Sequence, residues 1–290
     1  MRGRAWRVIG VSLLLFIIVE IGSCQIYDAV VSPVVADGLV RRETESSNGY
    51  SVSYLASIST KAELPRLLYV HGTPGDATAF ERYLLDPVPG FESLSVDRPG
   101  FGLTRPRKIA IHLVDQAKCL DPLLTTRNGR GTILVGHSLG GPIIVQAALD
   151  YPDRVAGLVI LSGSLDPELE AVAWYQRLAE FAIIPYMIPG DLRRANREVI
   201  PLKDELAGLR PRLKDLKCPV VIVHAPDDML VPVENVDYML AEFPKDSIVD
   251  VMRLDGKNHF VPWNAEADVR RAIQRIAEAA SGTAANHQGD

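Results

Sequence analysis

The run Thr132-Ile133-Leu134-Val135-Gly136-His137-Ser138-Leu139-Gly140-Gly141-Pro142 decides the fold of this chain. Its first four residues predict a short buried strand, and Pro142 suits the first turn of a helix because its missing N–H costs nothing there. Between strand and helix lies a Gly-x-Ser-x-Gly pattern, whose glycines permit a sharp turn that exposes a serine hydroxyl. The context therefore predicts Ser138 as a nucleophile; the alternative is a glycine-rich turn with a purely structural role.

Short apolar strands alternate with helical segments over the rest of the chain. We expect strands near residues 50–58, 67–70, 94–96, 132–135, 155–161, 219–223 and 249–254. We expect helices near residues 78–85, 109–126, 142–149 and 265–280. This alternation predicts a mostly parallel central sheet flanked by helices on both faces, with ligands bound beyond the carboxyl ends of its strands. A helical insertion at about 165–212 interrupts the alternation and is expected to form a cap over the site.

The composition fits one globular unit. Of the 290 residues, 47% are hydrophobic and 23% are charged, which is ordinary for a protein with a sizeable core. The formal net charge of −5 argues against nucleic acid as a partner, because such a surface needs concentrated basic residues. No cysteine or histidine spacing is typical of a metal site, and we expect Cys119 and Cys218 to be buried free thiols.

The N-terminus has the layout of an export signal. Three arginines precede an uncharged apolar run, Val8 to Val19, which is too short to span a bilayer comfortably. The run leads into Ile21-Gly22-Ser23-Cys24, which resembles the lipobox of bacterial lipoproteins. That resemblance implies a signal peptide over 1–23, acylation of Cys24, a tether over 24–48, and a membrane-anchored protein on the periplasmic or cell-surface side. The alternatives are an uncleaved anchor helix or an ordinary signal peptide with an incidental Cys24.

Around the serine, the chain resembles the α/β-hydrolase superfamily over roughly residues 50–280. We therefore expect an α/β-hydrolase domain over 49–280 with the cap inserted in it, and a disordered tail over 281–290. In this family the acid and the histidine follow the serine in that order. His259, in the loop after the last strand, is the histidine that the resemblance assigns as general base.

Two adjacent aspartates compete for the role of the acid. Asp228 fits the family pattern Asp-x-x-Val-Pro in the run Asp228-Met229-Leu230-Val231-Pro232, and Asp227 is then a turn residue. The acid would hold the imidazole in the correct tautomer and stabilise the imidazolium. For the oxyanion hole, the family resemblance implies the backbone N–H of Leu139 and that of Thr73, in His71-Gly72-Thr73-Pro74-Gly75. The alternative for this second loop is a plain tight turn.

The resemblance implies a cofactor-free serine hydrolase, of the carboxylesterase or lipase type, that acts on a small acyl substrate. Aromatic and apolar residues of the cap, such as Trp174 and Phe181, would either line an apolar acyl pocket or form the small core of the cap itself. Perhydrolase-like or C–C hydrolase chemistry on the same triad is a second hypothesis. A third is a non-catalytic, membrane-anchored binding protein that kept the fold.

Overall fold

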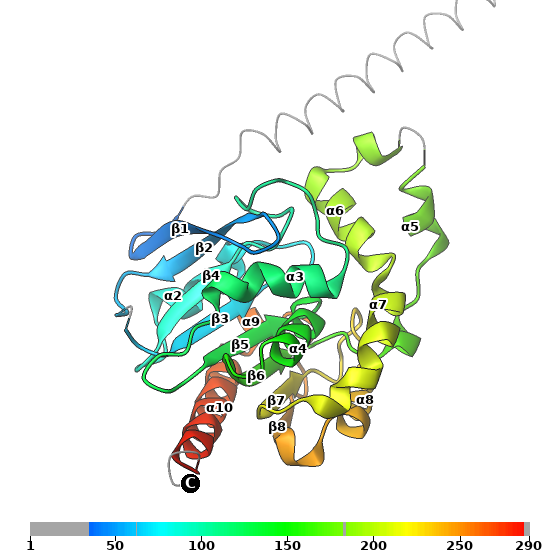
Figure 1. The fold of residues 1–290 in the computed structure, drawn as a ribbon. Helices are drawn as coiled ribbons and strands as arrows, with labels where there is room; N and C mark the ends of the chain where they lie inside the picture. The colour runs from blue at the N-terminus through cyan, green and yellow to red at the C-terminus, as the bar shows by residue number, and fades with distance from the viewer. Residues whose placement is uncertain (1–34, 62, 182–183, 287–290) are drawn as a thin grey trace, which may run out of the picture.

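The computed structural model describes residues 35–61, 63–181 and 184–286 (Figure 1). The lipobox with Cys24 lies outside the described residues, so the signal peptide and the lipid anchor stay predictions. Within the described ranges, no helix has both the length and the apolar character that crossing a membrane requires.

One eight-stranded sheet forms the centre of the molecule, in the order β1-β2-β4-β3-β5-β6-β7-β8. The strands are β1 Leu39–Glu45, β2 Ser51–Ser57, β3 Arg66–Val70, β4 Glu92–Val96, β5 Thr132–His137, β6 Val155–Leu161, β7 Val220–His224 and β8 Ile248–Arg253. The six strands from β4 to β8 are parallel neighbours, whereas β1 and β2 pair antiparallel at one edge. The predicted mostly parallel sheet is confirmed.

Helices cover both faces of the sheet, as predicted. They are η1 Ala77–Phe80, α2 Glu81–Leu85, α3 Leu113–Leu120, η2 Asp121–Leu123, α4 Gly140–Asp150, η3 Pro167–Leu169, α5 Trp174–Leu178, η4 Ile184–Met187, α6 Gly190–Val199, α7 Leu202–Leu209, η5 Arg210–Asp215, α8 Glu234–Glu242, η6 Lys245–Ser247, α9 Val261–Asn264 and α10 Glu266–Asn286. The residues of α3, α4 and α8 pack in one buried cluster, and those of α2 and α10 in another.

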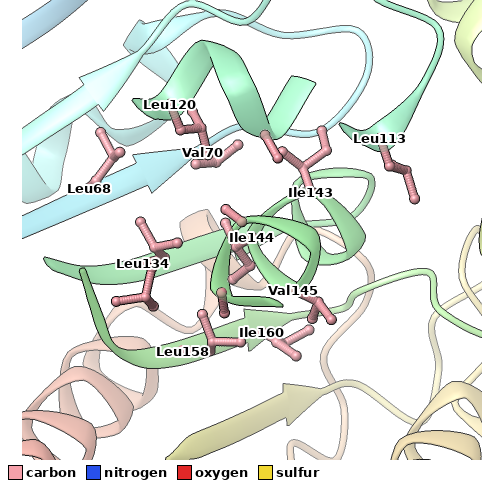
Figure 2. Packing of buried hydrophobic residues seen from close by; sticks show 14 of the residues in the cluster. Leu68, Val70, Leu113, Leu120, Leu134, Ile143, Ile144, Val145, Leu158 and Ile160 are labelled. Carbon is pink, nitrogen blue, oxygen red and sulfur yellow. The ribbon is translucent and has the colours of Figure 1, made fainter. Parts of the chain in front are cut away.

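The two clusters lie on opposite faces because side chains alternate along each strand. In β3, Tyr69 belongs to one cluster and Val70 to the other. Figure 2 shows the Val70 side, where Ile143 and Ile144 of α4 pack over Leu134 of β5. This packing fixes α4 against the sheet, and with it the turn that joins β5 to α4.

Two expected boundaries differ from the structure. Residues 39–45, which we assigned to the tether, form strand β1, paired along its whole length with β2. Their run Leu-Val-Arg-Arg-Glu-Thr-Glu is charged because β1 is an edge strand, where charge blunts pairing with other chains. The last helix continues to Asn286, so part of the expected tail is helical.

The segment between β6 and β7 carries α5, α6 and α7, which Figure 1 shows to one side of the sheet. We call residues 165–212 the cap segment. Its helices correspond to the predicted insertion. Cys119 and Cys218 are both buried and free, as expected.

Candidate active site

Ser138 occupies the sharp turn between β5 and α4. Its φ of 54° lies in the left-handed region, which a residue with a side chain adopts only when its surroundings enforce it. The flanking glycines provide that enforcement. A Cβ at Gly136 would lie 2.4 Å from the Gly140 carbonyl oxygen, and one at Gly140 would lie 2.3 Å from the Val70 carbonyl oxygen. The Gly-x-Ser-x-Gly pattern is therefore a requirement of close backbone packing, and it presents Ser138 at the carboxyl end of β5.

His259 and Asp228 meet at the same edge of the sheet. The His259 Nδ1–H donates to Asp228 Oδ2 at 2.8 Å, and both residues are buried. They come from the loops after β8 and β7, 31 residues apart in sequence. This bond leaves Nε2 as the ring nitrogen that can accept a proton.

The structure distinguishes the two adjacent aspartates. Asp227 is exposed, whereas the Asp228 carboxylate is buried against His259. The other oxygen of Asp228 accepts the backbone N–H groups of Leu230 and Val231 at 2.9 and 2.8 Å. Burial alone would raise the pKa of Asp228, but the hydrogen bonds from His259, Val231 and Leu230 lower it below its ordinary value. Asp228 is thus an ionised, fixed acceptor for the imidazole.

His137, the residue before the serine, ties the histidine loop to the serine turn. Its Nε2–H donates to the His259 carbonyl oxygen at 2.9 Å, and its ring lies 4.7 Å from the His259 ring. Burial, and then the neighbouring His259, lower the pKa of His137 to about 3. His137 is therefore neutral near pH 7 and acts as a hydrogen-bond donor that positions the loop of His259.

The loop after β3 faces the serine turn. A Cβ at Gly72 would lie 2.8 Å from the Ser138 Cβ, so this loop touches the serine. The next peptide bond, Thr73–Pro74, is cis. In the loop and turn hydrogen bonds of the described residues, neither the Thr73 N–H nor the Leu139 N–H has an acceptor. Thr73 lines the same cavity as Ser138, and Leu139 follows Ser138 directly, so both predicted donor residues lie near the serine.

A buried histidine shapes the same loop. The backbone N–H of Arg98 donates to His71 Nε2 at 3.1 Å, and because an N–H can only donate, Nε2 carries no proton. The proton is on Nδ1, which donates to the Gly72 carbonyl oxygen at 2.7 Å. Burial and the adjacent Arg98 guanidinium lower the pKa of His71 well below its ordinary value. His71 is therefore neutral, and its two hydrogen bonds hold the loop after β3 to the turn after β4.

A cavity of about 410 Å³ opens over these groups. Ser138 and His259 line it together with the loop after β3. Its apolar wall includes Leu230 from the loop after β7, Phe260 from the loop after β8, and Trp263 from helix α9. Two aromatic cap residues that we considered for this role, Trp174 and Phe181, are not among the described residues that line it; Trp174 is 75% exposed and Phe181 is 70% exposed.

Arg98 and Glu198 are the buried polar residues near the site that we did not single out from the sequence. Arg98 lies in the turn after β4, and Glu198 lies in α6 of the cap segment. Their side chains form an ion pair at 2.7 Å and each is 1% exposed. The Asp97-Arg98-Pro99-Gly100-Phe101-Gly102 turn was the available signal for Arg98; a lone glutamate in a charged helix gave no signal.

Comparisons with known proteins agree with this architecture. A family model described as alpha/beta hydrolase fold matches residues 65–182. The 2-(acetamidomethylene)succinate hydrolase of Mesorhizobium japonicum is 31% identical over 116 residues, which are 40% of this chain and 42% of that protein. The pimeloyl-[acyl-carrier protein] methyl ester esterase of Shewanella oneidensis is 35% identical over 107 residues, 37% of this chain and 38% of that protein. The chain therefore spans less than half the length of these two relatives.

Among solved structures, a membrane phospholipase A described as a bacterial virulence factor superposes with a TM-score of 0.63 at 17% identity, covering 96% of this chain and 99% of the other. At this identity the likeness concerns the fold alone. The matched relatives act on different substrates, so the chemistry has to be argued from the residues around Ser138.

Proposed function

We propose that this chain, which has the alpha/beta hydrolase fold, is a serine hydrolase that cleaves carboxylic esters through an acyl-enzyme on Ser138. One observation carries the proposal: His259, which is bonded to the buried Asp228 at 2.8 Å, lines the same cavity as a serine held at a φ of 54°. A serine hydroxyl needs a base and an exposed turn to become nucleophilic, and this arrangement supplies both.

In the proposed reaction, Ser138 Oγ attacks the carbonyl carbon of the ester while His259 Nε2 takes the hydroxyl proton. Asp228 stabilises the imidazolium, and the N–H groups of Leu139 and Thr73 stabilise the oxyanion. Collapse of the tetrahedral intermediate breaks the bond to the alkoxide leaving group, which receives the proton from His259. Water, deprotonated by His259, then attacks the acyl-enzyme, and the carboxylic acid leaves as Ser138 regains its proton.

The cavity wall favours an uncharged, apolar substrate. Leu230, Phe260 and Trp263 contribute apolar surface, whereas Asp76 contributes a carboxylate. Among the described residues that line the cavity there is no lysine or arginine, so an anionic substrate group would lack a counter-ion and lie near Asp76. The relative from Mesorhizobium is named for a succinate; this chain, in contrast, is expected to disfavour dicarboxylates.

A panel of p-nitrophenyl esters tests this proposal. We expect kcat/KM to rise from acetate to medium-length unbranched acyl chains, and to be at least about 10-fold lower for an acyl chain of equal length that ends in a carboxylate. Ser138→Ala should remove the activity toward all of them. A preference for the anionic ester would contradict the substrate class, and activity retained by Ser138→Ala would contradict the mechanism.

Two substitutions locate the acyl site. Trp263→Ala should lower kcat/KM for the longer acyl chains by about 10-fold while changing acetate little, because it removes apolar contact area from the cavity wall. Phe181→Ala, in the exposed part of the cap segment, is the matched control and should leave the chain-length profile unchanged. The opposite pattern would return the acyl pocket to the cap.

We also propose export and lipid anchoring at Cys24, which rest on the sequence of the first 24 residues. Expressed in a bacterium with its own N-terminus, the protein should sediment with membranes, and Cys24→Ser should move it to the soluble fraction. Cys119→Ser, which changes a buried thiol, is the control. Equal sedimentation of the Cys24→Ser variant and the wild type would rule out the acyl anchor.

A further inference from the structure

One carboxylate of the cap segment reaches the polar interior of the site. Glu198 is 2% exposed, although it belongs to a helix, α6, most of whose side chains are at least partly exposed. Its Oε1 accepts Arg98 Nη1 at 2.7 Å, and its Oε2 accepts Arg98 Nη2 at 3.1 Å. The two residues lie 100 positions apart, so this contact joins the cap segment to the turn after β4.

The same carboxylate holds the loop that carries the proposed oxyanion donor. The Thr73 Oγ1–H donates to Glu198 Oε2 at 2.7 Å. Arg98 donates in turn to the carbonyl oxygens of that loop, from Nη2 to Gly72 at 2.8 Å and from Nε to His71 at 2.9 Å. The Gly72–Thr73 peptide is thus held from its carbonyl by Arg98 and from the adjacent side chain by Glu198.

These bonds determine where the Thr73 N–H points. In a planar trans peptide the N–H is directed opposite to the carbonyl, and the Gly72 carbonyl points at Arg98. The Thr73 N–H therefore points away from Arg98, and the serine turn lies against the same loop at Gly72. The bonds to Arg98 and Glu198 orient the donor without touching the substrate.

We propose that Glu198 is a positioning residue: when the cap segment is docked, its carboxylate holds Thr73 and Arg98 so that the oxyanion site is ordered. This proposal rests on the proposed function. If α6 moves away, the carboxylate leaves Arg98, and a buried guanidinium loses its counter-ion while Thr73 loses its acceptor. Arg98 retains Gln116 and the two loop carbonyls, which are neutral partners. The oxyanion donor is therefore in place when the cap is docked, and misplaced when it is not.

Thr73→Val tests the bond most cleanly. Valine keeps the shape of the side chain and the backbone N–H, and it leaves the Arg98–Glu198 ion pair intact, so the fold should survive. We expect kcat for an uncharged p-nitrophenyl ester to fall about 10-fold with KM changed less than about 3-fold, because an oxyanion donor acts mainly in the transition state. Thr73→Ser keeps the hydroxyl and should restore kcat.

Glu198→Gln attacks the same bond from the cap side. It keeps the size of the side chain but loses the charge, and we expect kcat to fall by about 10- to 100-fold. Glu180→Gln is the matched control. Like Glu198, Glu180 forms an ion pair with an arginine, but its partner is Arg197 of α6 and the pair lies at the surface. Thermal unfolding of each variant, followed by circular dichroism, verifies that the protein measured is folded.

The rate of labelling of Ser138 by a fluorophosphonate separates the outcomes. A wild-type protein that is not labelled overturns the proposed function and this inference with it. A labelled wild type with slower labelling in Thr73→Val and Glu198→Gln, but not in Thr73→Ser or Glu180→Gln, supports the inference. A labelled wild type with all four variants within about 2-fold of it overturns the role of Glu198 and leaves the proposed function standing.

Discussion

The loops at the edge of the sheet and the cap segment are built on different principles. Around Ser138, the side chains of His137, Asp228 and His259 are buried, and each makes a directed hydrogen bond to another part of the site. In the cap segment, Trp174 and Phe181 are mostly exposed.

This contrast indicates which region of the molecule determines the geometry of the proposed catalytic residues. The serine turn is held by backbone contacts and by the packed helix α4, so its geometry does not depend on the cap. The cap segment contributes the buried ion pair of Glu198 with Arg98. We infer that the sheet loops determine which reaction occurs, and that the cap determines when the oxyanion site is complete.

The largest effect should come from the acid. Asp228→Asn should lower kcat by about 10⁴-fold, because the amide favours the wrong imidazole tautomer and cannot stabilise the imidazolium. Asp227→Asn, one residue away and exposed, should change kcat less than about 2-fold. Steady-state hydrolysis of an uncharged p-nitrophenyl ester measures both. An equal decrease in kcat in the two variants would contradict the assignment of the buried aspartate as the acid.

Replacing a glycine by alanine should change the free energy of unfolding in opposite directions in the two regions. Gly136→Ala should destabilise the protein by about 3 kcal/mol, because its Cβ would lie 2.4 Å from a backbone oxygen that the packed turn cannot move. Gly208→Ala, in helix α7 of the cap segment, meets nothing within 4 Å and should stabilise it by about 0.5–1 kcal/mol. Urea unfolding at pH 7 gives both values. A tolerated Gly136→Ala would show that the serine turn is less rigid than its contacts indicate.

Acid should weaken the sheet loops through their buried histidines. The pKa of His137 falls from 6.5 unfolded to about 3 folded, so the unfolded chain binds the extra proton between these values. Stability should therefore decrease as the pH falls from about 6.5 toward 3, by at most about 1.4 kcal/mol per pH unit for this group. Urea midpoints at several pH values should show a shallower decline for His137→Gln. An unchanged slope would mean that His137 is not neutral in the folded protein.

The bond between His112, just before α3, and Glu205 of α7 should contribute to stability with the opposite pH dependence. Its stabilisation should be small and should be lost as the pH rises. His112 is exposed and bonds Glu205 at 2.8 Å; this hydrogen bond, then the charge of Glu205, raise the pKa of His112 above 6.5. Its stabilisation is present below pH 6.5 and is lost as the pH rises through the folded value. In His112→Gln, the urea midpoint should differ from wild type more at pH 6 than at pH 9. A larger difference at pH 9 would contradict this sign.

The sequence predicted the centre of the fold better than its edges. Ser138 was recognisable because a strand, a glycine-rich turn and a helix follow one another locally. The family resemblance, through the order of the triad residues and the Asp-x-x-Val-Pro pattern, then led to His259 and Asp228. Strand β1 was missed because Arg41 and Arg42 give it the composition of a tether, although its pairing partner β2 follows directly in the sequence. A charged edge strand lacks the apolar pattern by which the buried strands were recognised.

Contacts between distant segments account for the rest. The apolar cap residues were open to two interpretations, pocket wall or cap core, whereas Trp263 reaches the cavity from helix α9. Glu198 was not predicted because its meaning depends on Arg98, a partner 100 residues away that the sequence does not identify. The bond between His137 and the His259 carbonyl is of the same kind, spanning 122 residues.

Labelling with a fluorophosphonate probe, followed by peptide mass spectrometry, tests the central claim most directly. We expect the native protein to be modified at Ser138. The Ser138→Ala variant should not be modified, whereas Ser59→Ala, which changes an exposed serine, should label like the wild type. Heat-denatured protein should not react, because the base and the oxyanion donors are then absent. A native protein that does not react, or a Ser138→Ala variant that reacts like the wild type, would contradict the role of Ser138 as the nucleophile.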